Sequence, residues 1–479
     1  PVYDDLMQNA IFVAGENDNS FDPGDYILFY GQAPGKWYFN PADNTFHENF
    51  NVYSDHTYYF ITTDMGPGRR IETVDNNSML SNISINNYND FLFHKNDDVN
   101  ILGTGRKWLE PLGNDEFKYS KTIEHLNTSF PVKVKANVVA RSFESSSFKL
   151  IASGSTISQV LIQKVIEGSL NDFARSKVMN ASFDPASDKI DLVLDYIRTH
   201  SSGTSWLDYL ELNFIRELKQ GKAQFLFRST ESVGTNRVAE FNIGEASANM
   251  RVWDVTDPIQ PREIKGSFSG STYRFKAETD VLKEFLAYDG SAFLKADFVE
   301  KVANQNLHGI PTPEMVVIAY PGFMNAAKRL ADFHRNDENM NIFLCTPQEV
   351  YNEFSSGAQD VTAIRNFMKM LYDRSDGNEF KYLMLFGDAS YDYKDRLPEN
   401  TNFVPSWESV ASYDMINSYV TDDYYGLLNE GEGLNIPVEE LDLGIGRIPV
   451  RSSQEADAIV DKILHYAGNP ENVMRPWRT

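Results

Sequence analysis

The sequence predicts a multidomain protein in which all-β regions come first and a doubly wound α/β domain follows. Short aromatic and β-branched runs separated by Gly, Pro and Asn recur up to about residue 277. From residue 314, apolar strands alternate with segments of helical period, which is typical of a parallel sheet covered by helices on both faces. We predict a small β domain at 1–115, a β-sandwich or jelly roll at 116–277, a linker at 278–310 and the first part of an α/β domain at 311–479.

Composition limits the class of protein. The chain has 479 residues, of which 42% are hydrophobic and 23% charged, as in a globular protein with more than one core. Its net charge of -24 argues against nucleic-acid binding, because phosphate contacts require clustered Lys and Arg. No apolar run approaches the ~18 residues of a transmembrane helix. Because the chain starts at Pro1 without a signal peptide, we expect a processed piece of a longer protein.

The β regions are predicted from alternation of apolar and polar residues between turn residues. In the first domain we expect strands at 25–30, 36–39 and 56–61, separated by Gly31, Gly35 and Pro41. In the second we expect seven strands, at 130–139, 189–196, 207–214, 223–227, 237–243, 250–255 and 271–277. Seven short strands with few helical patterns indicate a sandwich or jelly roll.

The α/β domain is predicted from a change of period. We expect strands at 315–320, 342–345, 382–386 and 443–450, and helices at 323–334, 347–354, 361–371 and 452–463. Thr346 and Glu349 form a predicted capping box around Pro347, and Ser452 and Glu455 form another.

Acidic residues follow the strand at 382–386. That strand ends at Gly387 and Asp388, and ligands of open parallel sheets bind beyond the carboxyl ends of the strands. A connection of roughly fifty residues follows, far longer than usual, and it carries Asp422 and Asp423. These carboxylates are candidates for holding a basic side chain of a substrate or orienting a catalytic histidine. The alternative is that they cap the loop's own amides or bind calcium.

Arg447 is the basic residue that we expect beside these carboxylates. It lies in the predicted strand at 443–450, directly after Gly444 and Gly446. We predict that it pairs with Asp388 or Asp422 as a structural clamp. The two glycines indicate close approach of another backbone.

Other candidate residues carry simpler interpretations. Cys345, the only cysteine, excludes a disulfide within the chain and is predicted to be a small buried hydrophobe. His334 and His465 lie on or near helix faces, and we assign no chemistry to them or to His308. The acids at 16–25 lack calcium-loop spacing and are expected to make turns. The stretch at 103–106 (GTGR) lacks the pattern of a nucleotide-binding loop.

Several ordered blocks resemble a known family. They are 351–357 (YNEFSSG), 363–369 (AIRNFMK), 385–388 (LFGD), 421–426 (TDDYYG), 444–450 (GIGRIPV) and 456–466. Together they resemble the gingipain family of cysteine peptidases, whose catalytic domain is a caspase-like α/β sandwich. Blocks at 4–13, 25–30, 58–62, 253–257 and 304–308 resemble the branch of that family that acts as a sortase in Bacteroidetes type IX secretion.

The resemblance implies a function for the complete protein. Members of this branch are outer membrane-associated enzymes of the cell surface that remove the carboxy-terminal sorting domain of secreted cargo. They pass the cargo, through a thioester, to anionic lipopolysaccharide, and they work beside an outer-membrane barrel of the secretion system. No cofactor is required, and structural calcium remains an alternative. Asp422 matches an acid of arginine-specific members and is therefore a candidate for a substrate pocket.

The same resemblance implies that this chain lacks a catalytic dyad. The family places its catalytic His after the block that ends near residue 466, and its Cys after the next strand. We therefore expect no catalytic residue here and an inactive fragment. The alternative from a different class is a non-catalytic surface binding or assembly module with a vestigial peptidase-like domain. Labelling of the complete protein with a thiol-reactive peptide ketone discriminates between the two.

Overall fold

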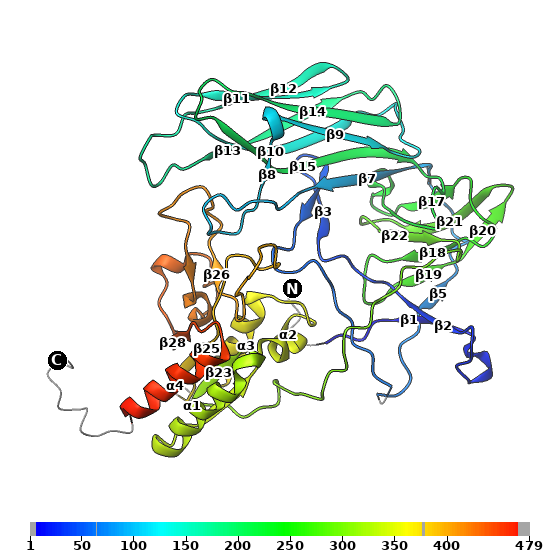
Figure 1. The fold of residues 1–479 in the computed structure, drawn as a ribbon. Coiled ribbons are helices and arrows are strands. Elements are labelled where there is room, and N and C mark those ends of the chain that lie inside the picture. The colour runs from blue at the N-terminus through cyan, green and yellow to red at the C-terminus, as the bar shows by residue number, and fades with distance from the viewer. Residues whose placement is uncertain (1–5, 64, 376–378, 468–479) are drawn as a thin grey trace.

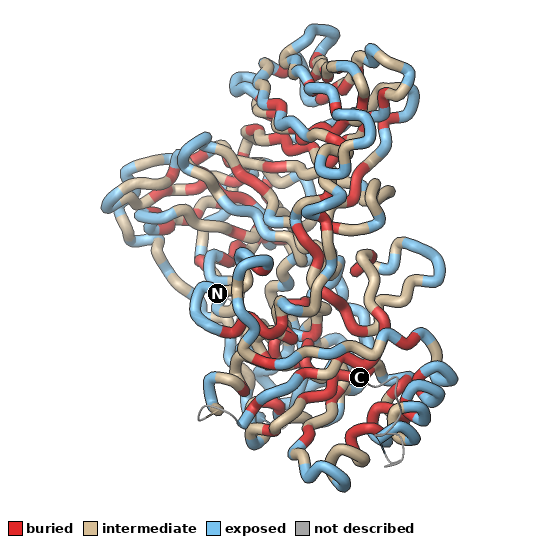
Figure 2. Tube along the Cα trace, turned by 90° about the vertical axis from the view of Figure 1, so that its left-hand side faces the viewer, coloured by how far each residue is buried: buried red, intermediate tan, exposed pale blue. Residues whose placement is uncertain are grey.

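The computed structural model describes residues 6–63, 65–375 and 379–467, which form two β-sandwiches and one α/β unit (Figure 1). Buried residues gather between the sheets of each sandwich and around the parallel sheet, whereas the loops are largely exposed (Figure 2). This arrangement confirms the predicted fold class of all-β regions followed by a doubly wound α/β domain. None of the described helices is long and apolar enough to cross a bilayer.

The first sandwich packs two antiparallel sheets face to face. One sheet has the order β13-β10-β15-β7 with β8 beside β15, and consists of β7 (Asn87–His94), β8 (Glu110–Pro111), β10 (Val132–Arg141), β13 (Arg175–Phe183) and β15 (Thr204–Glu217). The other has the order β12-β11-β14-β9, and consists of β9 (Glu116–Thr122), β11 (Ser146–Ala152), β12 (Ser155–Ile162) and β14 (Lys189–Ile197). Along β14, Ile190, Leu192 and Leu194 are buried while Lys189 and Asp191 are exposed, as period-two alternation dictates.

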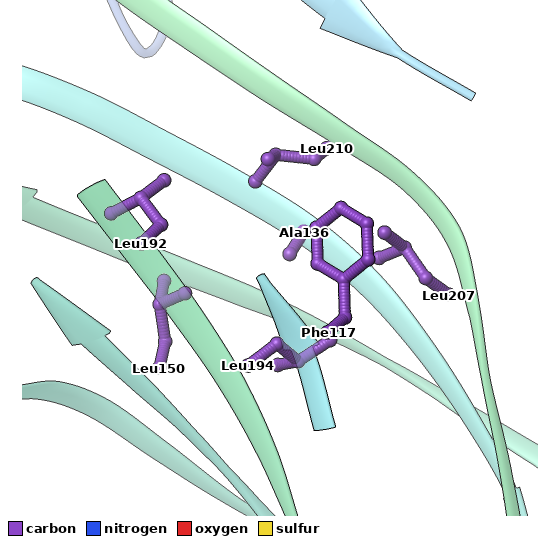
Figure 3. Close-up of a pocket in the computed structure, with 7 residues that line it drawn as sticks. All are labelled: Phe117, Ala136, Leu150, Leu192, Leu194, Leu207 and Leu210. Carbon is purple, nitrogen blue, oxygen red and sulfur yellow. The ribbon is translucent and has the colours of Figure 1, made fainter. Parts of the chain in front are cut away.

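The core of the first sandwich leaves almost no free space. A void of about 10 Å³ remains, surrounded by Phe117, Ala136, Leu150, Leu192, Leu194, Leu207 and Leu210 (Figure 3). That is no more than one water molecule needs, and every lining side chain is apolar. This void is therefore too small for a ligand.

The second sandwich combines strands from distant parts of the chain. One sheet has the order β16-β22-β18-β19-β5, and consists of β5 (Glu72–Val74), β16 (Gln224–Phe227), β18 (Arg251–Asp254), β19 (Arg262–Ile264) and β22 (Phe285–Tyr288). The other has the order β20-β21-β17-β6, and consists of β6 (Ile83–Ile85), β17 (Val238–Ile243), β20 (Gly266–Ser269) and β21 (Thr272–Glu278). β5 and β6 pair in parallel with β19 and β17. Phe227, Phe241, Phe275 and Phe285 form its aromatic core.

Two hairpins stand outside the sandwiches: β1 (Ile11–Ala14) with β2 (Tyr26–Phe29), and β3 (Lys36–Asn40) with β4 (Thr45–Asn49). The β3–β4 hairpin lies between the two sandwiches (Figure 1). The side-chain amide of Asn213 in β15 accepts from the backbone N–H of Phe46 at 2.6 Å and donates to its carbonyl at 2.9 Å. His47 Nδ1 lies 2.8 Å from Glu211 Oε2. These bonds fix the hairpin to the first sandwich.

The structure divides the β part of the chain differently from the predicted boundaries. Strands within 1–115 are shared between both sandwiches, and 116–277 contributes to both rather than forming one. The predicted linker 278–310 contains β22, which lies between β16 and β18 in the sheet and buries Phe285, Ala287 and Tyr288. Residues 56–61 form no strand, and of their side chains the Tyr59 ring contacts Phe29.

The α/β unit is a four-stranded parallel sheet covered on both faces. Its order is β24-β23-β25-β28, with β23 (Met315–Ala319), β24 (Ile342–Cys345), β25 (Tyr382–Phe386) and β28 (Gly444–Ile448). The helices are α1 (Met324–Asp337), α2 (Pro347–Phe354), α3 (Val361–Arg374) and α4 (Ser453–Ala467). Alternate residues of β23 face opposite sides: Val316 and Ile318 pack with α2 and α3, and Val317 and Ala319 with α1 and α4.

Helix starts follow the predicted caps. Thr346 Oγ1 accepts from the N–H of Glu349 at 3.2 Å, and the Glu349 carboxylate accepts from the N–H of Thr346 at 2.7 Å, which is the predicted capping box. At α4, Ser452 Oγ accepts from the N–H of Glu455, but the Glu455 carboxylate bonds to the N–H of Arg451 instead of Ser452.

The loops carry two short strands and six 3-10 turns: β26 (Trp407–Glu408), β27 (Val420–Thr421), η1 (Glu16–Asp18), η2 (Gly113–Asp115), η3 (Thr230–Ser232), η4 (Pro321–Phe323), η5 (Asp423–Gly426) and η6 (Ile436–Val438).

Candidate active-site rim

The candidate site lies at the carboxyl edge of the parallel sheet. The chain leaves β23 toward β24 on one side and returns to β25 on the other, so the order β24-β23-β25-β28 has its switch point between β23 and β25. Ligands of open α/β sheets bind at such a point, beyond the strand ends. Asp388, two residues after β25, is therefore placed where the sequence predicted.

Gly387 makes the turn at the end of β25. Its φ of +148° lies in a region that favours glycine, and a Cβ there would lie 3.2 Å from both Phe403 Cβ and Val404 Cγ2. The loop at 403–404 therefore packs directly over the strand end. The backbone N–H groups of Phe403 and Val404 both donate to the carbonyl of Asp388, at 3.1 Å each.

The side chain of Asp388 is held by two donors. Its Oδ2 accepts from Thr401 Oγ1 at 2.8 Å and from Arg451 Nε at 2.6 Å. The Asp388 side chain is only 12% exposed, whereas that of Arg451 is 67% exposed. Asp388 thus joins the loop at residue 401 to the start of α4, through an ion pair that water reaches from one side.

Arg447 forms the predicted clamp with Asp422. Its Nε donates to Asp422 Oδ2 at 2.8 Å and its Nη2 to Oδ1 at 2.7 Å, the bidentate geometry preferred by Arg and carboxylate. Nη1 donates to the carbonyls of Gly387 and Val404, and Nη2 also reaches the carbonyl of Pro405. Burial lowers the pKa of Arg447, but its hydrogen bonds with Asp422 and the charge of that residue outweigh burial and raise the pKa. The Arg447 side chain therefore joins β28 to the end of β25, to the loop at 404–405 and to Asp422.

The structure also places the remaining acids. Ser406 Oγ donates to Asp422 Oδ1 at 2.5 Å, so both oxygens of Asp422 are engaged. Asp423 is exposed at the start of η5. Other acids of the loops accept from the loops' own amides: Asp392 from Leu397 at 2.7 Å, and Asp442 from Leu428 at 2.8 Å.

The front of the chain covers this rim, which the sequence did not predict. The N–H of Gly105 donates to Glu408 Oε2 at 2.7 Å, and Arg106 Nε donates to the carbonyl of Glu408 at 2.6 Å. Gly105 has φ +78°, and a Cβ there would lie 2.6 Å from Ser412 Oγ. The stretch at 103–106 (GTGR), which has no nucleotide-binding pattern, thus works as a docking turn. Burial raises the pKa of Glu408 to about 7, although the bonds from Gly105 and Thr104 and the charge of Arg106 oppose that rise.

Further contacts extend this cover in both directions. Lys394 Nζ lies 2.6 Å from Asp55 Oδ1, and Tyr391 stacks on Trp108 with ring centroids 5.7 Å apart. Arg396 pairs with Asp97. These contacts join distant parts of the sequence. Residues near 55 and from 97 to 108 meet partners that lie about three hundred positions later in the chain.

Cys345 and the histidines take structural roles. Cys345 is 2% exposed, and burial, with the charge of Glu349 adding to it, raises its thiol pKa well above the usual value. A buried protonated thiol is inert, as predicted. His308 Nδ1 lies 2.7 Å from Glu353 Oε2 and its ring stacks on Phe354, which fixes the segment before β23 to α2. His334 pairs with Glu338, and His465 is exposed on α4.

Two smaller expectations have mixed outcomes. A Cβ on Gly444 would lie 3.0 Å from Tyr382 Cδ1, so that glycine does allow close approach. The expectation was wrong for Gly446, where a Cβ would meet no atom within 4 Å. Within residues 6–63, 65–375 and 379–467, no group of three or more His, Cys, Asp or Glu side chains is arranged to hold a metal ion.

Comparison with known proteins finds a family match for the part of the chain that holds the site. Residues 310–479 match the model of peptidase family C25. No curated protein sequence matches the chain. The chain is similar to the crystal structure of dimeric latent PorU from Porphyromonas gingivalis, with a TM-score of 0.83 and 23% identity over 96% of this chain. It spans 45% of the PorU chain.

A second solved structure matches only a part. The CBM36-1 domain of a multidomain xylanase from the hindgut metagenome of Trinervitermes trinervoides covers 26% of this chain and is itself covered to 96%, with 8% identity and a TM-score of 0.18. That likeness is too weak to bear on the whole fold. The PorU likeness, in contrast, extends over both sandwiches and the parallel sheet. Residues 310–479 therefore match peptidase family C25, the gingipain family, and the chain shares the fold of PorU over nearly its whole length.

Proposed function

We propose that this chain is the amino-terminal part of a gingipain-like cysteine endopeptidase and sortase of a type IX secretion system. The complete protein cleaves the carboxy-terminal sorting domain of secreted cargo and transfers the cargo to anionic lipopolysaccharide. The observation that carries the proposal is the peptidase family C25 domain at 310–479, attached to β-sandwiches in the PorU fold. Since the chain spans 45% of the PorU chain, the activity is assigned to the complete protein.

The described rim supplies support rather than chemistry in this proposal. Asp388, Arg447 and Asp422 hold the strand ends and loops in place through hydrogen bonds and ion pairs. Asp423, which is exposed, is the acid of this group that can meet a basic side chain of a substrate. Asp422 contributes to such a pocket through its position beside Asp423.

The catalytic pair lies outside the described residues in this proposal. Cys345 is buried as a protonated thiol, and His308 is held by Glu353, so neither has the access that a nucleophile or its base requires. The complete enzyme requires no cofactor, and structural calcium at loops remains part of the proposal. It works at the cell surface, associated with the outer membrane and with the barrel of the secretion system.

Active-site labelling of the complete protein tests this function. A peptidyl chloromethyl ketone with a basic residue next to the reactive group is expected to modify one cysteine, identified by mass spectrometry of the digested protein. The matched control is Cys345→Ala, which removes the buried thiol and should leave labelling unchanged. Cleavage of a cargo protein at its sorting domain should be lost after labelling.

The outcomes separate the two classes of function. Labelling at Cys345, or its loss in the Cys345→Ala protein, would contradict the assignment of that residue as structural. No labelling and no cleavage by the complete protein would favour a surface binding or assembly module over a peptidase.

A further inference from the structure

A polar recess lies between the β3–β4 hairpin and the second sandwich. Its volume is about 110 Å³, roughly ten times the ~10–15 Å³ that one water requires. Trp37, Phe39 and Phe46 of the hairpin form one wall. Arg228, which follows β16, and residues 282–284, which precede β22, form the other. Unlike the void in the first sandwich, this recess has charged residues in its lining.

Arg228 has donors that the protein leaves unused. The residue is 5% exposed, and its guanidinium lies 4.2 Å from the centroid of the Trp37 ring and 5.5 Å from that of Phe46. Its Nη2 pairs with Glu284 Oε1. Nε and Nη1 have no hydrogen-bond acceptor among the described residues. Buried polar groups nearly always find partners, so these donors indicate a missing acceptor.

Another arginine of the same sandwich shows the usual solution. Arg251 is also stacked on an aromatic ring, with Phe12 at 4.2 Å. Its Nε and Nη2 both donate to the Glu263 carboxylate, at 2.7 and 2.5 Å. An arginine of this sandwich can therefore stack on an aromatic ring and still pair with a carboxylate through two hydrogen bonds. Stacking alone does not explain why two donors of Arg228 lack an acceptor.

Charge and shape define the chemistry that fits. Lys283 also lines the recess; its side chain is 27% exposed, and its Nζ lies 3.3 Å from Asp254 Oδ2. Glu284 and Asp254 place two negative charges beside the two cations, which disfavours a phosphate dianion more than a ligand with one negative charge. The side chains of Phe39 and Leu282 offer contact to an apolar body.

We propose that this recess binds a small planar carboxylate with an apolar body. The carboxylate accepts from Nη1 of Arg228 and is attracted by Lys283, while the body lies against Phe39 and Leu282. The lining comes from both the hairpin and the second sandwich, and Asn213 already fixes the hairpin to the first sandwich. A bound carboxylate therefore strengthens the connection between the two sandwiches.

Calorimetric titration of the complete protein with benzoate tests the proposal. Benzoate is expected to bind at one site, and benzamide, its uncharged counterpart of the same shape, about tenfold or more weakly, as for the loss of charge-assisted hydrogen bonds. Inorganic phosphate at the same concentration should bind more weakly than benzoate. Equal binding of benzamide, tighter binding of phosphate, or no binding of benzoate would overturn the proposal.

Variants locate the site. Arg228→Met should abolish benzoate binding, and the matched variant Arg251→Met, at the stacked arginine whose donors are satisfied, should retain it. Leu282→Trp keeps Arg228 but fills the recess, so it should also abolish binding and serves if the Arg228→Met protein does not fold. Lys283→Gln should weaken binding several-fold. Undiminished binding by the Leu282→Trp protein would place the ligand elsewhere.

Discussion

Ionisation of Glu408 should loosen the contact between the front of the chain and the peptidase-family domain. Burial raises the pKa of this carboxyl from 4.5 to about 7. Between those pH values the folded protein keeps a proton that the unfolded chain has lost, so the free energy of unfolding falls as the pH rises and levels off above pH 7. Each unit of pKa difference between the folded and unfolded states corresponds to about 1.4 kcal/mol, so the shift of Glu408 contributes about 3 kcal/mol to the free energy of unfolding. This contribution is fully present below pH 4.5.

Urea denaturation at pH 5 and pH 8 measures this effect. Glu408→Gln is the matched variant, because its amide oxygen can still accept from Gly105 but does not ionise. The wild-type protein should lose about 2.5 kcal/mol more than the variant between the two pH values, because part of the contribution is already lost at pH 5. Amide hydrogen exchange of residues 100–108, compared between the two proteins at each pH, should show faster opening of the wild-type turn at pH 8. An identical pH dependence in both proteins would refute the reasoning.

Three substitutions test the packing of the rim and the sheet. Asp422→Asn leaves the buried Arg447 without its charge partner and should lower the free energy of unfolding by about 3–5 kcal/mol in urea denaturation. Asp423→Asn, at the exposed neighbour, should lower it by less than about 0.5 kcal/mol. Equal losses would contradict the clamp. Gly105→Ala, at φ +78° and against the loop, should speed hydrogen exchange at 405–412 several-fold, and unchanged exchange would show that the turn does not depend on glycine. Phe367→Ala empties a fully buried position of α3 and should cost about 3–5 kcal/mol in the same denaturation assay; a smaller loss would mean that the site collapses.

The α/β domain was the most predictable part, because its signals are local. A strand such as β25 is a short apolar run ended by Gly387, and the capping box of Thr346 and Glu349 marks the start of α2 within four residues. Once strands and helices alternate, the parallel sheet and its carboxyl edge follow. The position of Asp388 and the pairing of Arg447 with Asp422 or Asp388 could therefore be predicted, with the choice of Asp422 left to the structure.

The β part was less predictable, because its pairings are distant. Nothing in the composition of β5 indicates that it pairs with β19 near residue 263, and nothing in that of β6 indicates that it pairs with β17 near residue 240. β22 is four residues long and buried, which sequence periodicity does not distinguish from an apolar stretch in a linker. The turn at Gly105 and the buried Glu408 were missed for the same reason, since each becomes meaningful only beside the other.

The parallel pairing of β5 with β19 and of β6 with β17 has a consequence for biosynthesis. On the ribosome, β5 and β6 emerge before every strand of the first sandwich, which runs from β7 to β15, and their partners β19 and β17 emerge only after that sandwich is complete. The two segments must wait unpaired while a whole neighbouring unit is made, which is a window for edge-to-edge aggregation. Folding of this chain therefore gains from chaperones that shield β5 and β6 until their partners are made. The second sandwich cannot be expressed by itself from one continuous segment of the gene.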